Sequence, residues 1–124
     1  MTGSLTKTHL KQNNMNLQLS LKTKWFEMTR DGIKTEDYRE LTRYWYNRLV
    51  EEGICELEPF KVLVVVKCEE FTTNTLTLGY PSKTDTSRII KFEHAGIEIR
   101  TGNPEWGAEE GKLYFVIKHG KRIQ

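Results

Sequence analysis

The spacing of the strand-like segments in the second half of the chain constrains its fold most strongly. Alternating or β-branched stretches follow one another with connections too short to contain a helix, at 75–80, 88–92, 97–100 and 113–118. Parallel neighbours need a long crossover connection, so this spacing favours antiparallel pairing and disfavours a Rossmann-like sheet. Two helical patterns come earlier. We therefore expect an α+β domain, a small, mostly antiparallel β-barrel with two or more flanking helices.

Residues 16–21 predict a strand and the residues after them a helix. Leucines alternate with polar residues from Leu17 to Leu21, as in a half-buried strand. Thr23 is expected to cap the helix through its hydroxyl. Helical spacing predicts that the side facing the core consists of Leu21, Trp25 and Met28.

Two glycines are expected to end helices. Gly32 can close the first helix in the left-handed conformation, and an extended segment then runs to Arg39. A second helix is expected from Thr42 to Gly53, with an apolar stripe of Leu41, Trp45 and Leu49. Beyond it, the apolar run 60–67 predicts a central strand buried on both faces.

The later segments predict a hairpin and a closing strand. Residues 88–92 and 97–100 are expected to pair through a turn at Ala95 and Gly96. The run 102–104 breaks the chain, and 113–118 is expected to be the last strand.

Composition limits the class of protein. The 124 residues suit one domain, with 37% hydrophobic and 29% charged residues. A formal net charge of +2 is too small to indicate nucleic-acid binding by bulk charge, so such binding would need a local basic patch. Cys55 and Cys68 lack the spacing of a disulfide framework or zinc site, which favours a reducing cytoplasm.

The start of the chain is polar, and no segment resembles a membrane span. Residues 1–14 lack the apolar centre of a secretion signal, so we expect a disordered leader or tag followed by one domain over 15–124. The longest apolar run, 62–66, is far too short to cross a bilayer. We expect no membrane partner, no metal and no cofactor, and the oligomeric state stays open.

Ionisable side chains gather just after Gly32, at the expected junction of helix and strand. They are Lys34, Glu36, Asp37, Tyr38 and Arg39. If Lys34 still lies in the turn, its ammonium can converge with Asp37 and Arg39 on one opening and bind phosphate or act as a base. The alternative is a surface lysine beside an Asp37–Arg39 or Glu36–Arg39 ion pair. Spacing alone favours neither.

Aromatic side chains supply further candidates. Trp106, in the glycine-bracketed loop 102–107, can stack on a base or plug one end of the barrel, and the plug is the more common role of a lone tryptophan. Asn103 is more typical of a turn. On the second helix, the surface residues able to contact single-stranded nucleic acid are Arg43, Tyr44 and Arg48.

The histidines and the basic end of the chain carry less information. His94 and His119 have no partner at metal-ligand spacing, so neither is assigned a catalytic role. The basic residues after 117 can extend a positive patch, although a short charged tail is usually only solvated.

The residues around Gly32 resemble a known family. Gly32-x-Lys34-x-x-Asp37-x-Arg39, after a strand and a helix, is similar to the signature of the ASCH domain, a branch of the PUA-like superfamily. The resemblance covers the chain from about Met15 to its end. It continues through Trp25-Phe26, Tyr38-Arg39-Glu40, Tyr44-Trp45, Gly79-Tyr80, 103–108 and 114–118.

The resemblance implies a PUA-like barrel that binds RNA or nucleotides in a cleft beside the helix preceding the motif. Lys34 and Arg39 would contact phosphate, and Asp37 would orient them or read a donor edge of the ligand. A base would stack on Tyr38, Tyr80 or Trp106. The family motif usually has glutamate at the position of Asp37.

The alternative is a small hydrolase acting on a modified nucleoside or on RNA. Some relatives are acetylcytidine amidohydrolases with a lysine, a threonine three residues later and a distant glutamate. Lys34 matches the lysine, but Asp37 occupies the threonine position, Thr35 is displaced and the glutamate has no evident equivalent. An enzyme of this kind would use Lys34 as base and Asp37 or Glu36 as its partner. A protein-interaction domain is a third possibility.

Overall fold

The computed structural model describes residues 15–53 and 66–124. The predicted leader, Cys55 and residues 60–65 of the predicted central strand lie outside the described residues.

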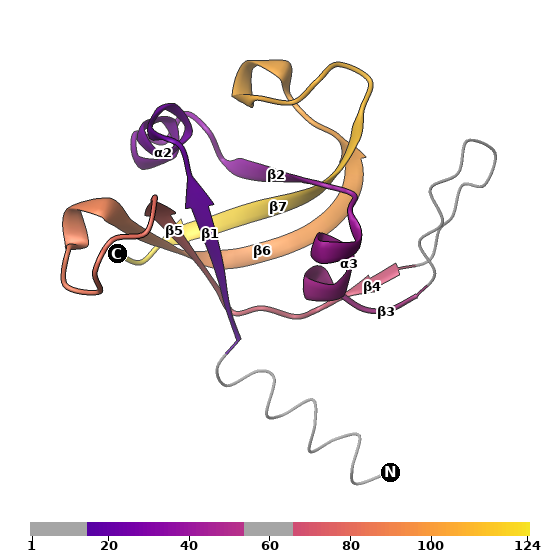
Figure 1. Cartoon of the computed structure of the whole chain (residues 1–124), viewed down its shortest axis with the longest axis horizontal. Coiled ribbons are helices and arrows are strands. Elements are labelled where there is room, and N and C mark those ends of the chain that lie inside the picture. Colours follow the sequence, from indigo (N-terminus) through magenta and orange to yellow (C-terminus); the bar gives the residue numbers. More distant parts are fainter. Residues whose placement is uncertain (1–14, 54–65) are drawn as a thin grey trace, which may run out of the picture. The chain divides into compact units, whose positions relative to one another are not determined.

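Seven strands and two helices make up the regular structure of the described residues (Figure 1). The helices are α2 (Thr23–Arg30) and α3 (Arg43–Leu49). The strands are β1 (Asn16–Leu21), β2 (Glu36–Glu40), β3 (Val50–Gly53), β4 (Val66–Cys68), β5 (Thr73–Leu78), β6 (Ile89–Thr101) and β7 (Leu113–Arg122). Short 3₁₀ turns are η1 (Thr86–Arg88) and η2 (Pro104–Trp106).

Hydrogen bonds join five of the strands in the order β1-β5-β6-β7-β2, while β3 and β4 form a separate pair. The expected α+β class with a mostly antiparallel sheet and two helices is confirmed. The chain divides into two compact units. Of the described residues, the first unit consists of 15–37, 70–96 and 117–124, and the second of 38–53, 66–69 and 97–116.

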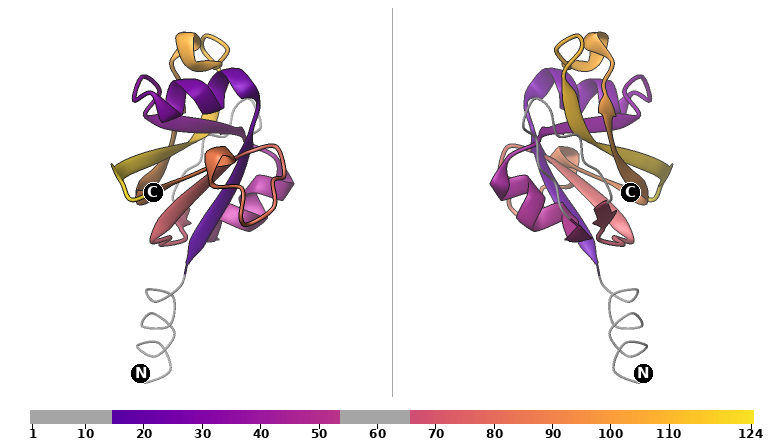
Figure 2. Two further views of the ribbon diagram at one scale, coloured as in Figure 1. Left: turned by 90° about the vertical axis from the view of Figure 1, so that its left-hand side faces the viewer. Right: turned by 90° about the vertical axis from the view of Figure 1, so that its right-hand side faces the viewer.

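In the first unit, β1 and β5 run parallel and in register, from Asn16 opposite Thr73 to Leu21 opposite Leu78. Figure 2 shows the two strands side by side. The predicted alternation in β1 is confirmed, because its three leucines are buried and Gln18 is exposed. The core of this unit consists of Leu17, Leu19, Leu21, Phe26, Leu76, Ile90 and Ile117.

Strand β5 is buried on both faces, although four of its six residues are polar. Asn74, Thr75, Leu76 and Thr77 are successive buried residues, and β5 pairs with β1 along one edge and with an antiparallel β6 along the other. Hydrogen bonds compensate the burial of its side chains: the Thr75 hydroxyl, for example, lies 2.6 Å from the side-chain oxygen of Asn16.

The buried side of α2 differs from the prediction. Lys22 is the N-cap and makes no side-chain cap bond, so Thr23 is the first helical residue rather than the cap. Phe26 and Thr29 are buried, whereas Trp25 is only partly so. The predicted apolar stripe started at Leu21, but Leu21 belongs to strand β1. Helical spacing counted from that residue therefore does not identify the buried side of α2. The Thr29 hydroxyl is satisfied by the carbonyl of Trp25 at 2.7 Å.

In the second unit, α3 ends four residues before the predicted stop. The Thr42 hydroxyl caps it by accepting a bond from the amide of Trp45. After Leu49 the backbone becomes extended, and Val50 begins strand β3, which ends at Gly53. The described end of the predicted central strand is β4, which pairs antiparallel with β3 only, so it does not lie centrally in the larger sheet.

The predicted hairpin is one continuous strand, β6, and the predicted turn at Ala95 and Gly96 is wrong. Gly96 adopts φ 114° within the strand and causes no reversal. A Cβ atom there would lie 3.6 Å from Cε of Lys118, an ordinary contact, so the backbone conformation rather than a lack of space favours glycine. Strand β7 is also longer than predicted and continues to Arg122.

A small cluster packs around Tyr38 in the second unit. Its ring contacts the buried residues Ala108, Tyr114 and Val116. The rings of Tyr38 and Tyr114 lie 5.7 Å apart. Gly102 is in contact with the Tyr38 ring, since a Cβ at this position would lie 2.7 Å from two of its carbons.

Neither of the helices in the described ranges is long and apolar enough to span a bilayer.

Candidate ligand-binding site

The strongest candidate is a buried ion pair at the start of β2. Lys34 and Asp37 are 3% and 4% exposed, and Lys34 Nζ lies 3.3 Å from Asp37 Oδ1. The ammonium also donates to the carbonyl oxygen of Glu36 at 2.6 Å. Lys34 is therefore not the surface lysine of the alternative hypothesis, and two of the predicted site residues are in direct contact.

The end of α2 directs Lys34 inward. Gly32 adopts φ 80°, as predicted for the closing glycine. The amides of Ile33 and Lys34 both donate to the carbonyl of Met28, at 2.9 and 3.1 Å. This tight turn leaves Ile33 exposed and Lys34 buried, so that the lysine reaches Asp37 on the adjoining strand.

His119, on β7, lies beside this pair. Its amide donates to the carbonyl of Thr35 at 3.2 Å. Burial lowers the pKa of His119 from 6.5 to about 4. The charge of Asp37 opposes this shift, and that of Lys34 reinforces it. The imidazole is thus neutral at pH 7 and lies within electrostatic reach of the Lys34 ammonium and the Asp37 carboxylate.

Asn74 connects His119 to a second histidine. Its side-chain nitrogen lies 2.8 Å from His119 Nδ1 and 3.1 Å from the carbonyl of Lys118. Its side-chain oxygen lies 2.7 Å from His94 Nδ1. Burial lowers the pKa of His94 to about 4, and the charge of Lys118 contributes. A buried polar chain therefore runs from β6 through β5 to β7.

Sequence reasoning missed this chain, because its members are 20 and 45 residues apart. One signal could have indicated it. Asn74 and Leu76 are two residues apart in a strand, so their side chains point to the same face. A strand that includes both therefore predicts an amide facing the core.

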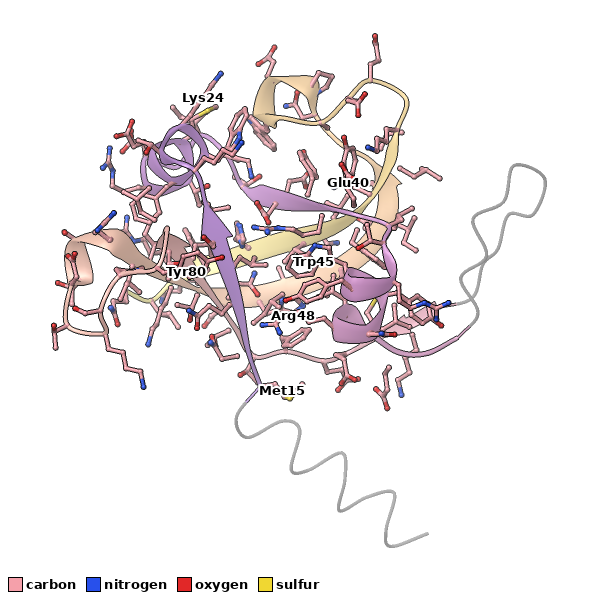
Figure 3. All side chains as sticks on the ribbon, viewed as in Figure 1. Met15, Lys24, Glu40, Trp45, Arg48 and Tyr80 are labelled. Carbon is pink, nitrogen blue, oxygen red and sulfur yellow. The ribbon has the colours of Figure 1, made fainter. Side chains whose placement is uncertain are left out.

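Two further predicted residues lie in the first unit. Glu36 is partly buried, and its carbonyl accepts from Lys34. Tyr80 is 92% exposed in the loop after β5, where Figure 3 labels it. Its ring is accessible to a ligand.

The other predicted residues belong to the second unit. The Tyr38 hydroxyl accepts a hydrogen bond from the amide of Asn103 at 2.9 Å. The side-chain oxygen of Asn103 caps η2 through the amide of Glu105, so the asparagine forms a turn as expected. Trp106 is partly exposed at the end of η2. Tyr38 and Asn103 thus organise the loop that carries Trp106.

Arg39 lies over an aromatic side chain of α3. Its guanidinium carbon is 4.9 Å from the centroid of the Trp45 ring. Tyr44 is 63% exposed and meets Trp45 edge-on, with ring centroids 5.1 Å apart. Arg43 and Arg48 are exposed, and Figure 3 shows Trp45 and Arg48 on the same side of α3. The helix presents rings and guanidinium groups, as its sequence predicted.

No cluster of three or more potential metal-ligating side chains occurs among residues 15–53 and 66–124. Comparison of the chain with models of protein families, with curated proteins and with solved structures gives no match.

Proposed function

We propose that this protein is an RNA- or nucleotide-binding module of the ASCH and PUA-like type. The ligand would bind beside the segment Gly32–Arg39. The observation that carries the proposal is the buried contact between Lys34 and Asp37, which acts electrostatically on the neutral His119.

The energetics of the ion pair support a binding role. Burying two charges costs several kcal/mol per ion, and apolar residues of similar size often give equal or greater stability. A buried Lys–Asp pair is therefore weak evidence of a stabilising role, which leaves room for a role in binding. The ammonium, the carboxylate and His119 together offer donors and an acceptor, which suits the mixed polar edge of a nucleobase.

The exposed side chains of the first unit support the same class of ligand. Tyr80 offers an open ring for base stacking. Lys121, at the end of β7, is exposed and can meet phosphate. In the second unit Arg39 and Trp106 remain proposed contacts, while Tyr38 and Asn103 would act by holding the 102–107 loop.

The test is fluorescence anisotropy with labelled, mixed-sequence single-stranded RNA. The variant K34Q/D37N removes both charges at nearly constant size and should weaken binding by about tenfold or more. Tyr80→Ala should cost a similar factor, since stacking contributes about 1–3 kcal/mol per base.

The control removes both charges of a second ion pair, as K34Q/D37N does for the first. Lys112 lies 3.1 Å from Glu40, and their side chains are 37% and 61% exposed. K112Q/E40Q should therefore bind RNA like the unmodified protein. Equal binding by K34Q/D37N, with wild-type RNA binding intact, would exclude Lys34 and Asp37 from the site.

A small hydrolase acting on a modified nucleoside or RNA is the second candidate. The observation in its favour is the contact of an ammonium with a carboxylate, both of which act electrostatically on a neutral imidazole, since such groups can serve as general acids and bases. Turnover of acylated cytidines should then be measurable and be lost in Lys34→Gln. Absence of turnover across such a panel, and of any RNA cleavage, would rule out this candidate.

A further inference from the structure

The buried chain His94–Asn74–His119 determines where the proton of His119 resides. The carbonyl of Lys118 can only accept, so it orients the Asn74 amide with its nitrogen toward β7. That nitrogen then donates to His119 Nδ1 at 2.8 Å. Nδ1 is therefore unprotonated, and the neutral ring of His119 carries its proton on Nε2.

His94 completes this arrangement from the other side. The Asn74 oxygen accepts from His94 Nδ1 at 2.7 Å, and Asn74 itself is fully buried. The ring of His94 meets that of Phe71 edge-on, with centroids 5.5 Å apart. Both polar ends of the amide are thus used, and the amide has no reason to flip.

The Nε2–H of His119 is a buried donor without a hydrogen-bond partner among the described residues. Leaving such a group unsatisfied costs about 1–3 kcal/mol. The ring cannot readily turn to find a partner, because it stacks on Phe92 with centroids 5.0 Å apart and an interplanar angle of 21°. The donor is held in place.

The charges around this donor indicate what it can receive. Two carboxylates, those of Asp37 and Glu36, and one ammonium, that of Lys34, act electrostatically on His119, and Lys34 already contacts Asp37. These carboxylates outnumber the ammonium and would repel an anionic phosphate, whereas a neutral oxygen or nitrogen would meet no such repulsion.

We propose that His119 is a ligand-binding residue whose Nε2–H donates to a neutral acceptor, a carbonyl oxygen or ring nitrogen of a nucleobase. Asn74 and His94 are its positioning residues. The inference rests on the proposed function and names the part of the ligand that the site recognises.

The first measurement concerns the free protein. A long-range ¹H–¹⁵N spectrum at about pH 7 should show His119 with a protonated Nε2 and an unprotonated Nδ1, with assignment through His119→Phe. Asn74→Asp places a carboxylate against Nδ1 and should move the proton to that atom. A wild-type His119 protonated on Nδ1 would overturn the inference without touching the proposed function.

The second measurement concerns binding. Titration with adenosine, guanosine, cytidine and uridine, one at a time, should shift the His119 Nε2–H signal with at least one nucleoside, and inorganic phosphate should not. His119→Phe keeps the stacked ring and should weaken binding of the RNA oligonucleotide by about tenfold. Exposed Gln18 on β1 supplies the control, and Gln18→Ala should bind normally.

The outcomes separate the two proposals. Normal RNA binding by His119→Phe, or a signal that responds only to phosphate, would overturn this inference and leave the proposed function standing. A wild-type protein that binds neither RNA nor any nucleoside would remove the proposed function, and the role of His119 with it. If His119→Phe does not fold, the nucleoside titration of the wild-type protein decides.

Discussion

The ammonium of Lys34 lies 3.3 Å from Asp37 Oδ1 in a setting where both side chains are almost completely shielded from water. The pair is local, three residues apart, and the turn after Gly32 brings it together. Its members depend on each other, because either charge alone would be buried without its counterion.

Removal of one partner should therefore cost more than removal of both. Lys34→Met should lower the free energy of unfolding by about 3–5 kcal/mol, since Asp37 loses its ammonium. K34M/D37L replaces both groups by apolar side chains and should recover most of that loss. Urea denaturation at neutral pH measures both values, and a single variant as stable as the wild type would contradict the coupling.

Stability should decrease on mild acidification because of the two partly buried histidines, His94 and His119. Their pKa values are about 4 in the folded protein and about 6.5 when unfolded. Between these limits the unfolded chain binds more protons, so the free energy of unfolding falls as the pH drops from 6.5 toward 4. Above pH 6.5 the histidines contribute no pH dependence.

The size of this effect can be checked by denaturation at about pH 7 and about pH 5. His119 should account for a loss on the order of 1–2 kcal/mol, and the more exposed His94 for less. In His119→Phe, the free energy of unfolding should depend less on pH between about 7 and about 5. An unchanged slope in that variant would show that other groups cause the acid sensitivity.

Gly102→Ala should destabilise the protein because it overpacks the second unit. The new methyl group would lie 2.7 Å from the Tyr38 ring and 2.8 Å from Cβ of Ala108. We expect a loss of about 1–3 kcal/mol in the free energy of unfolding. Tyr38→Leu should relieve part of this clash, so the double variant should lose less than the sum of the two single losses.

The two threonines near the helix starts should respond differently to alanine. Thr42 caps α3, so Thr42→Ala should cost about 0.5–1 kcal/mol. Thr23 is the first helical residue of α2, and Lys22 occupies its N-cap. Thr23→Ala should therefore change stability little. Equal losses in thermal or chemical denaturation would show that the capping bond is not what stabilises α3.

Local patterns predicted the elements whose signals lie within a few residues. The leucine alternation located β1, and Gly32 marked the turn after α2 in its left-handed conformation. The buried partners Lys34 and Asp37 were also among the candidates, because their spacing of three spans a single turn.

Features that depend on distant residues were not predictable in this way. Gly96 looks like a turn residue in isolation, and only the neighbouring strand shows that it lies within β6. Gly53 likewise belongs to a strand because β4 pairs with it. His119 gained significance only from Asn74, 45 residues away, through a contact that no local spacing encodes.

The parallel register of β1 against β5 has a consequence for how the chain folds. Strand β1 pairs with residues 57 positions further along the chain. Pairing therefore requires closure of a long loop, and the chain loses this entropy before the hydrogen bonds of the pair can compensate it. During synthesis the leucines of β1 cannot be covered until β5 has been translated. We expect this edge to be the slowest part of the molecule to assemble, and the segment most in need of protection from other chains meanwhile.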